Sequence, residues 1–249
     1  MKKTVRSLQK MKQDGVRIQM LTCYDFQMAA VLNQTELDLI LVGDSVGNVV
    51  LGYDTTVEVS LEEMQIFGAA VRRGAPEKFV VVDMPFGSYA SMETGLKNAI
   101  ELYQSTKAEA LKLEGANQIN LDLIKRLTET GIAVMGHIGL QPQSVHAQGG
   151  YFKHGKEQID KERLMSESLA LQEAGCFAIV LEFVEENLAQ EISKALTIPT
   201  IGIGSGVNVD GQVLVINDLL GMGENAPGFV KPIANLFQVK KLAIEKYLQ

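Results

Sequence analysis

The sequence has few cysteines, fewer cationic than acidic residues, and no long apolar run. Its only two cysteines among 249 residues are Cys23 and Cys176. Two isolated thiols provide neither a disulfide framework nor the paired spacing of a zinc site. Both are therefore expected to be buried free thiols.

The charge balance excludes several kinds of partner. The formal net charge is -7, whereas nucleic-acid and anionic-membrane surfaces need clustered Lys and Arg. The one basic cluster, in the first dozen residues, is expected to be a solvated arm or helix rather than a binding patch; it contains Lys2, Lys3, Arg6, Lys10 and Lys12. No run of about 18 apolar residues could span a membrane, and no apolar core follows the first charges as in a signal peptide. We therefore expect a cytoplasmic protein.

Apolar runs of strand length alternate with helical segments about eight times. The expected strands cover residues 18–23, 39–42, 79–82, 110–113, 132–135, 177–181, 200–203 and 213–216. This alternation is typical of parallel β/α packing, and a (β/α)8 barrel needs about 250 residues. We predict a single (β/α)8 TIM barrel over residues 1–249, with a short N-terminal helix that buries Leu8 and Met11. An open, doubly wound sheet is the alternative, because alternation does not show that the first and last strands meet.

Two connections are long and rich in glycine. Residues 44–59 follow the second strand, and such long loops are usually functional or disordered. Residues 138–160 contain His146, Tyr151 and His154, and either a mobile lid or a flexible crossover fits their composition. Shorter signals include Asp25 as a helix cap and Ser60 with Glu63 as a capping box.

Five strands are each followed by an ionisable side chain, just past the carboxyl end, where barrels build their active sites. These side chains are Asp44, Asp83, Glu114, His137 and Glu182. Any one of them could be a helix cap or a core histidine, but the repetition of position favours a site. Three carboxylates from successive strands would repel one another, and a divalent cation resolves that repulsion. Oxygen ligands favour Mg²⁺ or Mn²⁺ over Zn²⁺.

A metal of this kind can bind a small oxo acid and stabilise an enolate, which requires a base. Glu182 arrives from the opposite arc of the barrel and could serve, because partial desolvation raises the pKa of a glutamate. Lys112 points to the same side of its strand as Glu114 and either pairs with a site carboxylate or binds substrate. The glycine-rich residues 202–206 form a tight turn in the preferred interpretation and a phosphate cradle in the other.

With these residues assembled, the sequence resembles the ketopantoate hydroxymethyltransferase family over nearly its whole length. The resemblance lies in the order and spacing of short segments: residues 41–45 with Gly52, 54–56, 70–76, 83–86, 112–115, 136–140, 142–144, 149–151, Glu182, 198–199 and 202–204.

The resemblance implies an enzyme that uses methylene-tetrahydrofolate to hydroxymethylate a 2-oxo acid. It implies Mg²⁺ held by Asp44, Asp83 and Glu114, and Glu182 as the catalytic base. The implied substrate-binding residues are Asp44, Ser45, Asp83, Lys112 and His137. A homo-oligomer, decamer-like in related proteins, is also implied.

Several positions depart from the family's usual pattern: Tyr53, Ala116, Phe183, Ser205, the loop around His146 and Ala147, and a shorter C-terminus. None removes a proposed catalytic group. Two other functions stay open. One is a metal-dependent carbon–carbon lyase of the isocitrate-lyase and phosphoenolpyruvate-mutase type, although the two long loops lack the cysteine that such lyases present. The other is a non-catalytic barrel that binds an oxo acid.

Overall fold

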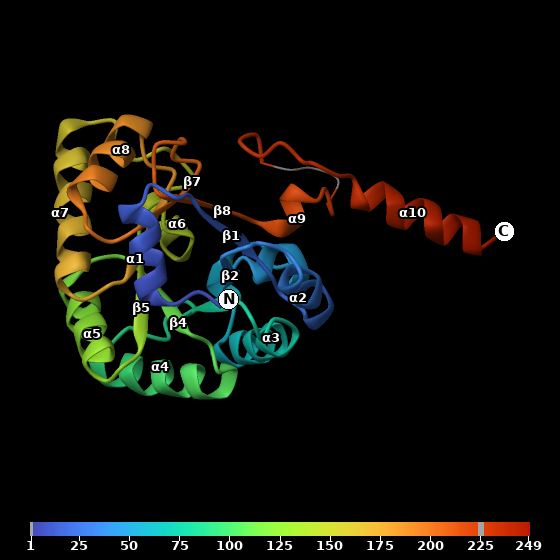
Figure 1. The fold of residues 1–249 in the computed structure, drawn as a ribbon, viewed down its shortest axis with the longest axis horizontal. Coiled ribbons are helices and arrows are strands. Elements are labelled where there is room, and N and C mark those ends of the chain that lie inside the picture. Colours follow the sequence, from blue (N-terminus) through green and yellow to red (C-terminus); the bar gives the residue numbers. More distant parts are fainter. Residues whose placement is uncertain (1, 224–226) are drawn as a thin grey trace. The chain divides into compact units, whose positions relative to one another are not determined.

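Eight parallel strands close into a barrel in the order in which they occur in the chain (Figure 1). The computed structural model describes residues 2–223 and 227–249. The strands are β1 (Ile18–Thr22), β2 (Leu39–Val42), β3 (Phe79–Asp83), β4 (Ala110–Glu114), β5 (Ala133–Gly139), β6 (Ala178–Glu182), β7 (Thr200–Ile203) and β8 (Gly211–Leu214). The prediction of a (β/α)8 barrel is confirmed, and the open sheet is excluded.

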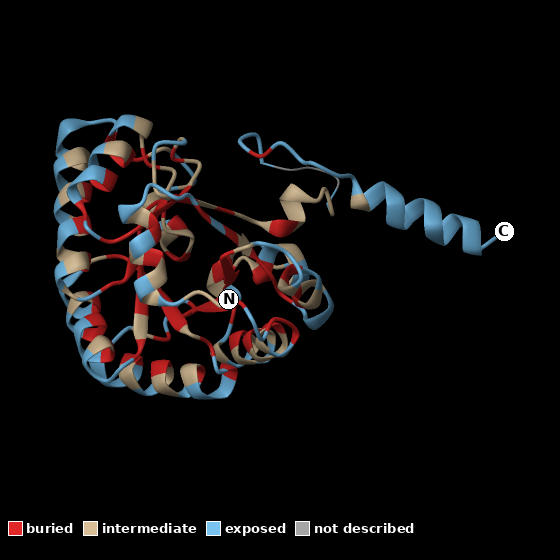
Figure 2. Ribbon diagram, viewed as in Figure 1, coloured by how far each residue is buried: buried red, intermediate tan, exposed pale blue. Residues whose placement is uncertain are grey.

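Helices alternate with these strands. They are α1 (Val5–Gln13), α2 (Phe26–Asn33), α3 (Leu61–Gly74), α4 (Met92–Thr106), α5 (Gln118–Glu129), α6 (Val145–Gln148), α7 (Gln158–Glu173), α8 (Glu186–Ala195), α9 (Ile216–Leu219) and α10 (Leu236–Tyr247). Figure 2 shows that α3, α4, α5, α7 and α8 expose one side to solvent while the strands between them are buried. The predicted caps are confirmed: Asp25 accepts the Met28 N–H, and Ser60 and Glu63 form a capping box at the start of α3.

The register of neighbouring strands places their carboxyl ends at one rim. Asp83 pairs with Lys112, Glu114 with His137, and Gly139 with Glu182. Side chains that are far apart in sequence are brought to one level of the barrel by this ladder.

The opposite end of the barrel is closed by α1. Leu8 and Met11 are buried in one cluster with strand residues from inside the barrel, as predicted. The lysines of this segment are held by carboxylates rather than left as a basic patch: Lys2 pairs with Glu109, Lys3 with Asp38 (3.1 Å), Lys10 with Asp14 (2.9 Å) and Lys12 with Asp210 (2.7 Å).

Two strands differ from their predicted bounds by more than one residue. Strand β5 runs to Gly139 rather than ending at residue 135, because β4 and β6 both pair with it as far as the rim. Strand β8 begins at Gly211, two residues earlier than predicted, and Ile216 already belongs to α9. A Cβ at position 211 would lie 2.6 Å from the carbonyl oxygen of Ile18, so glycine permits the close approach of β8 to β1.

The two long connections contain more regular structure than expected. Residues 44–59 include a π-helix, Gly47–Leu51, and a 3-10 helix, Thr56–Glu58. The segment after β5 contains a 3-10 helix, Pro142–Ser144, and then α6. Short helices of this kind carry too few residues to show a hydrophobic period, so the sequence pattern did not reveal them.

The chain divides into two compact units, Met1–Val213 and Leu214–Gln249. The first is the barrel. The second contains α9 and α10, and α10 has no buried residue. The expectation of one domain over residues 1–249 stays a prediction. No helix among the described residues is long and apolar enough to cross a membrane.

Candidate active site

The ionisable residues predicted at the strand ends do meet at the carboxyl rim of the barrel. Asp83, Glu114 and Glu182 are the last residues of β3, β4 and β6, and Asp44 follows β2 by two positions. Asp44, Asp83 and Glu114 are each at most 4% exposed. His137 lies within β5 rather than beyond it.

A continuous path of contacts joins these groups. The backbone N–H of Asp44 donates to Oδ2 of Asp83 at 3.2 Å. The ammonium nitrogen of Lys112 lies 3.1 Å from Oδ1 of Asp83 and 3.3 Å from Nδ1 of His137. The salt bridge expected of Lys112 is therefore present, and the same lysine reaches the histidine of the next strand.

His137 connects the carboxylates to Glu182. Its Nδ1 lies 3.3 Å from Oε1 of Glu114, and its Nε2 lies 3.2 Å from Oε2 of Glu182. Within the described part of the chain, Nε2 of His137, Oε1 of Glu114 and Oδ1 of Asp83 are buried without a well-aligned hydrogen bond. Their contacts are ion pairs with Glu182, His137 and Lys112, respectively, so their hydrogen-bonding capacity is not fully used.

The carboxylates do not share one electrostatic environment. Burial raises the pKa of Asp44 well above its ordinary value, and the charges of Asp83 and Glu114 raise it further. Burial also raises the pKa of Asp83, although Lys112 opposes the shift. Burial would raise the pKa of Glu114 as well, but His137 and Lys112 outweigh it and lower that pKa. The ionised forms of Asp44 and Asp83 are thus less well compensated than that of Glu114.

The two cationic groups of the site, Lys112 and His137, are both expected to be protonated near neutral pH. Burial lowers the pKa of Lys112, but the three surrounding carboxylates raise it above its ordinary value. Burial and Lys112 also lower the pKa of His137, but contacts with Glu114 and Glu182 raise it to about 9.

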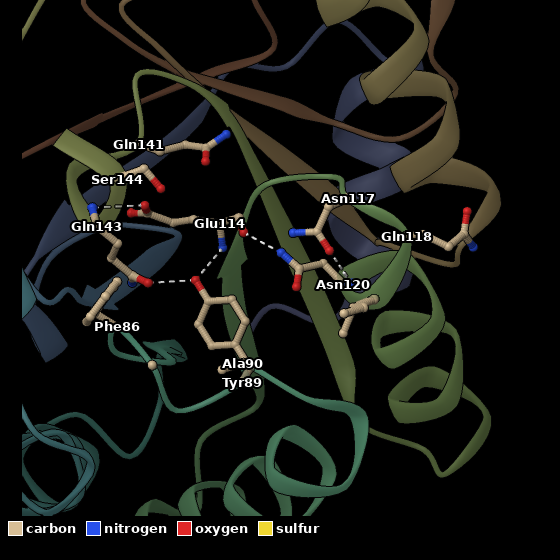
Figure 3. Close-up of a pocket in the computed structure, with 12 residues that line it drawn as sticks. Phe86, Tyr89, Ala90, Glu114, Asn117, Gln118, Asn120, Gln141, Gln143 and Ser144 are labelled. Carbon is tan, nitrogen blue, oxygen red and sulfur yellow. Dashed lines mark hydrogen bonds between the residues drawn. The ribbon is translucent and has the colours of Figure 1, made fainter. Parts of the chain in front are cut away.

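Gln143 is the main site residue that the sequence analysis missed. Its side-chain Nε2 donates to Oδ2 of Asp44 at 2.8 Å and to the carbonyl of Met84 at 2.9 Å. Its backbone N–H donates to Oε2 of Glu114 at 3.2 Å, and the Tyr89 hydroxyl donates to its Oε1 at 2.6 Å (Figure 3). The only available signal was its place in a segment, residues 142–144, that resembles the family.

Ser45 lies beside the carboxylates, and its role as a substrate contact stays a prediction. A Cβ at Gly43 would be 2.8 Å from Oγ of Ser45 and 3.5 Å from Oδ2 of Asp83, so both side chains converge on this glycine. The buried hydroxyl of Tyr24 lies 2.8 Å from Oγ of Ser45. Tyr24, also missed from the sequence, fixes the orientation of this serine.

The donor set suits a hard divalent cation. The buried carboxylates of Asp44, Asp83 and Glu114 repel one another, and their negative charge is what Mg²⁺ or Mn²⁺ would neutralise. Among the described residues, however, no three His, Cys, Asp or Glu side chains are already arranged to hold a metal. Lys112, His137 and Gln143 contact oxygens of these carboxylates. The ligand set stays a prediction.

The backbone after Glu182 is tightly held. Phe183 has a φ of 49°, which is unusual for a residue with a bulky side chain. Its N–H donates to the carbonyl of Ile203, and its own carbonyl accepts the N–H of His154 at 2.7 Å. Ser205 in the turn after β7 accepts the Val184 N–H and donates to the Leu181 carbonyl. These bonds support the tight-turn interpretation of residues 202–206.

Both cysteines are buried free thiols, as predicted. Burial raises the pKa of each thiol to about 12. Neither can act as a thiolate nucleophile near neutral pH.

Solved structures share the fold of this chain. A phosphonopyruvate hydrolase, solved with oxalate and Mg²⁺, matches with a TM-score of 0.64 and 11% identity over 85% of this chain and 80% of its own. A 2,3-dimethylmalate lyase of the phosphoenolpyruvate mutase and isocitrate lyase superfamily matches with a TM-score of 0.63 and 15% identity over 84% of this chain and 79% of its own. The chain has the β/α-barrel fold of these proteins, with a carboxylate-rich site at the rim.

Sequence comparison assigns the family within that class. The model of the ketopantoate hydroxymethyltransferase family matches residues 2–249. A 3-methyl-2-oxobutanoate hydroxymethyltransferase from Bacteroides thetaiotaomicron is 47% identical over 99% of this chain and 91% of the relative. One from Thermosipho africanus is 49% identical over 98% of this chain and 92% of the relative. The chain belongs to the ketopantoate hydroxymethyltransferase family, and the lyase alternative is not favoured.

Proposed function

We propose that this chain transfers a hydroxymethyl group from methylene-tetrahydrofolate to 3-methyl-2-oxobutanoate and so forms 2-dehydropantoate for pantothenate biosynthesis. Family membership supports the reaction. The structural observation that carries the proposal is the contact path from Asp83 through Lys112 and His137 to Glu182. It joins groups that attract an anionic substrate to a candidate base.

The substrate is a small anion, and Lys112 is the buried cation that attracts its carboxylate or oxo group. Ser45, oriented by Tyr24, supplies a hydroxyl on the same side. His137 can donate from Nε2, which lies 3.2 Å from Glu182. Asp44 and Asp83 complete the substrate site, so the oxo acid is bound between the carboxylates and Glu182.

Glu182 is the proposed base, and its side chain is 17% exposed. Its carboxylate takes the proton from C3 of the oxo acid, and the electron pair of that C–H bond forms the enolate. The enolate pair then forms a carbon–carbon bond to the methylene carbon of the carrier. One water supplies the hydroxyl oxygen, and the carrier nitrogens leave protonated, which balances the reaction.

Asp44, Asp83 and Glu114 are the residues that would hold a divalent metal ion. Such an ion supplies Lewis-acid stabilisation of negative charge on the substrate oxygen. Gln143 bonds one oxygen of Asp44, and Lys112 contacts one oxygen of Asp83, so a bound ion would share these carboxylates with both side chains or displace them.

The surroundings of the enzyme are also proposed. The net charge of -7 does not favour nucleic acid, and the relatives support a small-molecule enzyme. We place it in the cytoplasm as a homo-oligomer, for which a decamer-like assembly is one arrangement.

Exchange of the substrate C3 proton tests the proposal. Wild-type protein incubated with Mg²⁺ and 3-methyl-2-oxobutanoate in D₂O should replace that proton with deuterium, which NMR detects. A Glu182→Gln variant should lose the exchange. Absence of exchange in wild-type protein with bound substrate would show a non-catalytic oxo-acid-binding barrel, whereas normal exchange in Glu182→Gln would remove only the base assignment.

A further inference from the structure

A cavity of about 580 Å³ opens beside the carboxylate cluster (Figure 3). Its walls come from the loops that follow β3, β4 and β5, and the residues that matter here are Phe86, Tyr89, Asn117, Ile119, Gln141 and Gln143. Glu114 lines it too, so the cavity borders the proposed oxo-acid site. Cavities of ~300–1,000 Å³ hold drug-sized ligands, and a five-carbon acid would leave most of this one empty.

Two large apolar side chains of the cavity are left uncovered. Phe86 is 52% exposed and Ile119 is 48% exposed, and they come from different loops. Tyr89 presents a third, half-buried ring. Uncovered apolar and aromatic surface at a cavity favours a ligand with flat apolar faces, such as an aromatic ring system.

The remaining lining is rich in amides. The side-chain amide of Gln141 has no hydrogen-bond partner among the described residues, although its backbone N–H donates to Gln148. Oδ1 of Asn117 caps α5 by accepting the Asn120 N–H, while its Nδ2 has no partner in the described part of the chain. These amides offer both donors and acceptors, which suits a ring whose edge carries the same groups.

Backbone geometry keeps the Gln141 amide close to the carboxylate cluster. Gly115 follows Glu114 with a φ of +86°, and a Cβ there would lie 3.3 Å from Oε1 of Gln141. The amide therefore lies directly over the residue that follows β4. A larger residue at Gly115 would be strained by its own backbone and would crowd this amide.

The charge of the cavity narrows the choice of ligand. Among the twelve described residues that line it, Glu114 is the only charged one and none is Lys or Arg. The N-terminus of α5 also lines the cavity, but Oδ1 of Asn117 already caps that end. Without a cation, the lining does not balance the charge of a nucleotide's phosphates. The expected ligand is an uncharged flat heterocycle whose edge carries hydrogen-bonding groups.

We propose that this cavity, named here the amide pocket, binds the nitrogen heterocycle of the one-carbon carrier. This inference rests on the proposed function, which requires a carrier next to the oxo acid. Tyr89 and Gln143 form the shared wall: the Tyr89 hydroxyl donates to Gln143 at 2.6 Å, and Gln143 donates to Asp44 at 2.8 Å. Gln143 alone thus separates a ring in the amide pocket from Asp44, one of the carboxylates that border the substrate.

Binding of tetrahydrofolate to the full chain, with Mg²⁺ and 3-methyl-2-oxobutanoate present, tests the assignment. Phe86→Ala and Ile119→Ala should each raise the Kd about tenfold, as measured by calorimetry. Both residues are well exposed, so the variants should fold, and circular dichroism checks this. The matched control is Ile66→Ala on α3, where the isoleucine is 60% exposed outside the pocket. It should bind tetrahydrofolate like wild type.

Guanosine distinguishes the carrier from other flat heterocycles with similar edges. It should bind at least tenfold more weakly than tetrahydrofolate, and tighter guanosine binding would overturn the carrier assignment. An unchanged Kd in both Phe86→Ala and Ile119→Ala would overturn the pocket. Proton exchange at C3 by wild-type protein needs no carrier. If wild-type protein exchanges the proton but Phe86→Ala and Ile119→Ala bind tetrahydrofolate like wild type, only the pocket assignment is refuted. If the two variants bind tetrahydrofolate more weakly but wild-type protein does not exchange the proton, only the proposed function is refuted.

Discussion

Gln143 holds Asp44 through a buried hydrogen bond of 2.8 Å between Nε2 and Oδ2. The two residues are 99 positions apart. The same amide accepts from Tyr89, so one side chain fixes both the carboxylate cluster and the wall of the amide pocket.

Replacing Gln143 with alanine should therefore destabilise the protein. The substitution leaves Asp44 and the Tyr89 hydroxyl without their partner, and a buried unsatisfied polar group costs about 1–3 kcal/mol. Urea unfolding measures the loss. Gln141→Ala is the matched control, because the Gln141 side chain makes no hydrogen bond to a described residue; it should change stability by less than about 0.5 kcal/mol. Equal effects of the two substitutions would contradict the prediction.

Mg²⁺ should stabilise the folded protein through the carboxylates. A ligand at one hundred times its Kd adds about 2.7 kcal/mol, which raises the Tm in a thermal melt. Asp83→Asn should abolish this rise because it removes a proposed ligand. Asp25→Asn should retain it, since asparagine still caps α2. A full Mg²⁺ response in Asp83→Asn would remove that residue from the ligand set, and Asp44→Asn tests the second ligand in the same way.

The left-handed backbone at Phe183 should reverse the usual order of two substitutions. With a φ of 49°, Phe183→Gly should be more stable than Phe183→Ala by about 1 kcal/mol. At Ile66, inside α3, the glycine variant should instead be the less stable by a similar amount. Chemical unfolding of the four variants measures both differences. The same order at both positions would show that the backbone beside Glu182 is not strained.

The segment that contains His154 should open more easily as the pH falls. Burial lowers the pKa of His154, and Arg163 lowers it further, while Asp160 at 3.9 Å opposes the shift. The opened segment has an ordinary pKa of about 6.5 and therefore binds more protons than the closed one below that pH. The free energy of opening should then decrease as the pH falls from about 6.5 through the lowered pKa of the folded form.

Hydrogen exchange at the amides of His154 and Glu185 measures this opening. The His154 N–H donates to the Phe183 carbonyl and the Glu185 N–H donates to the His154 carbonyl, so both bonds join the His154 segment to the residues that follow β6. After correction for intrinsic rates, their protection should be lower at pH 5.5 than at pH 7.5. The core amide of Ile179 provides the reference. A His154→Gln variant should lose the pH dependence, and an unchanged dependence in that variant would assign it to another group.

The parts of the site that could be predicted from the sequence share one property. Asp44, Asp83, Glu114 and Glu182 stand at the ends of apolar runs, so the strand pattern alone placed them at one rim. Lys112 followed from the alternation of side chains along a strand. In each case, a pattern within a few neighbouring residues of a strand was enough to predict where the side chain lies in the barrel.

Residues held by long-range contacts gave no such signal. Gln143 bonds to Asp44 and to Tyr89, which is 54 positions away. A loop has no repeating hydrophobic pattern, so the sequence does not indicate that this amide is buried. The start of β8 was predicted wrongly for a related reason. Gly211 is positioned by its close approach to Ile18 in β1, which lies near the beginning of the chain. Only the closed barrel shows these relationships.

The lysine that anchors α1 has a consequence for synthesis on the ribosome. Lys12 donates to the carbonyl of Ser193 and to Asp210, which are 181 and 198 positions later in the chain. The backbone N–H of Ile18 likewise donates to the carbonyl of Asp210. Lys12 and the Ile18 N–H must therefore wait for nearly the whole barrel before their partners exist. A nascent chain stopped before residue 210 would lack the carboxylate and the carbonyl that tie the end of α1 and the start of β1 to the last part of the barrel.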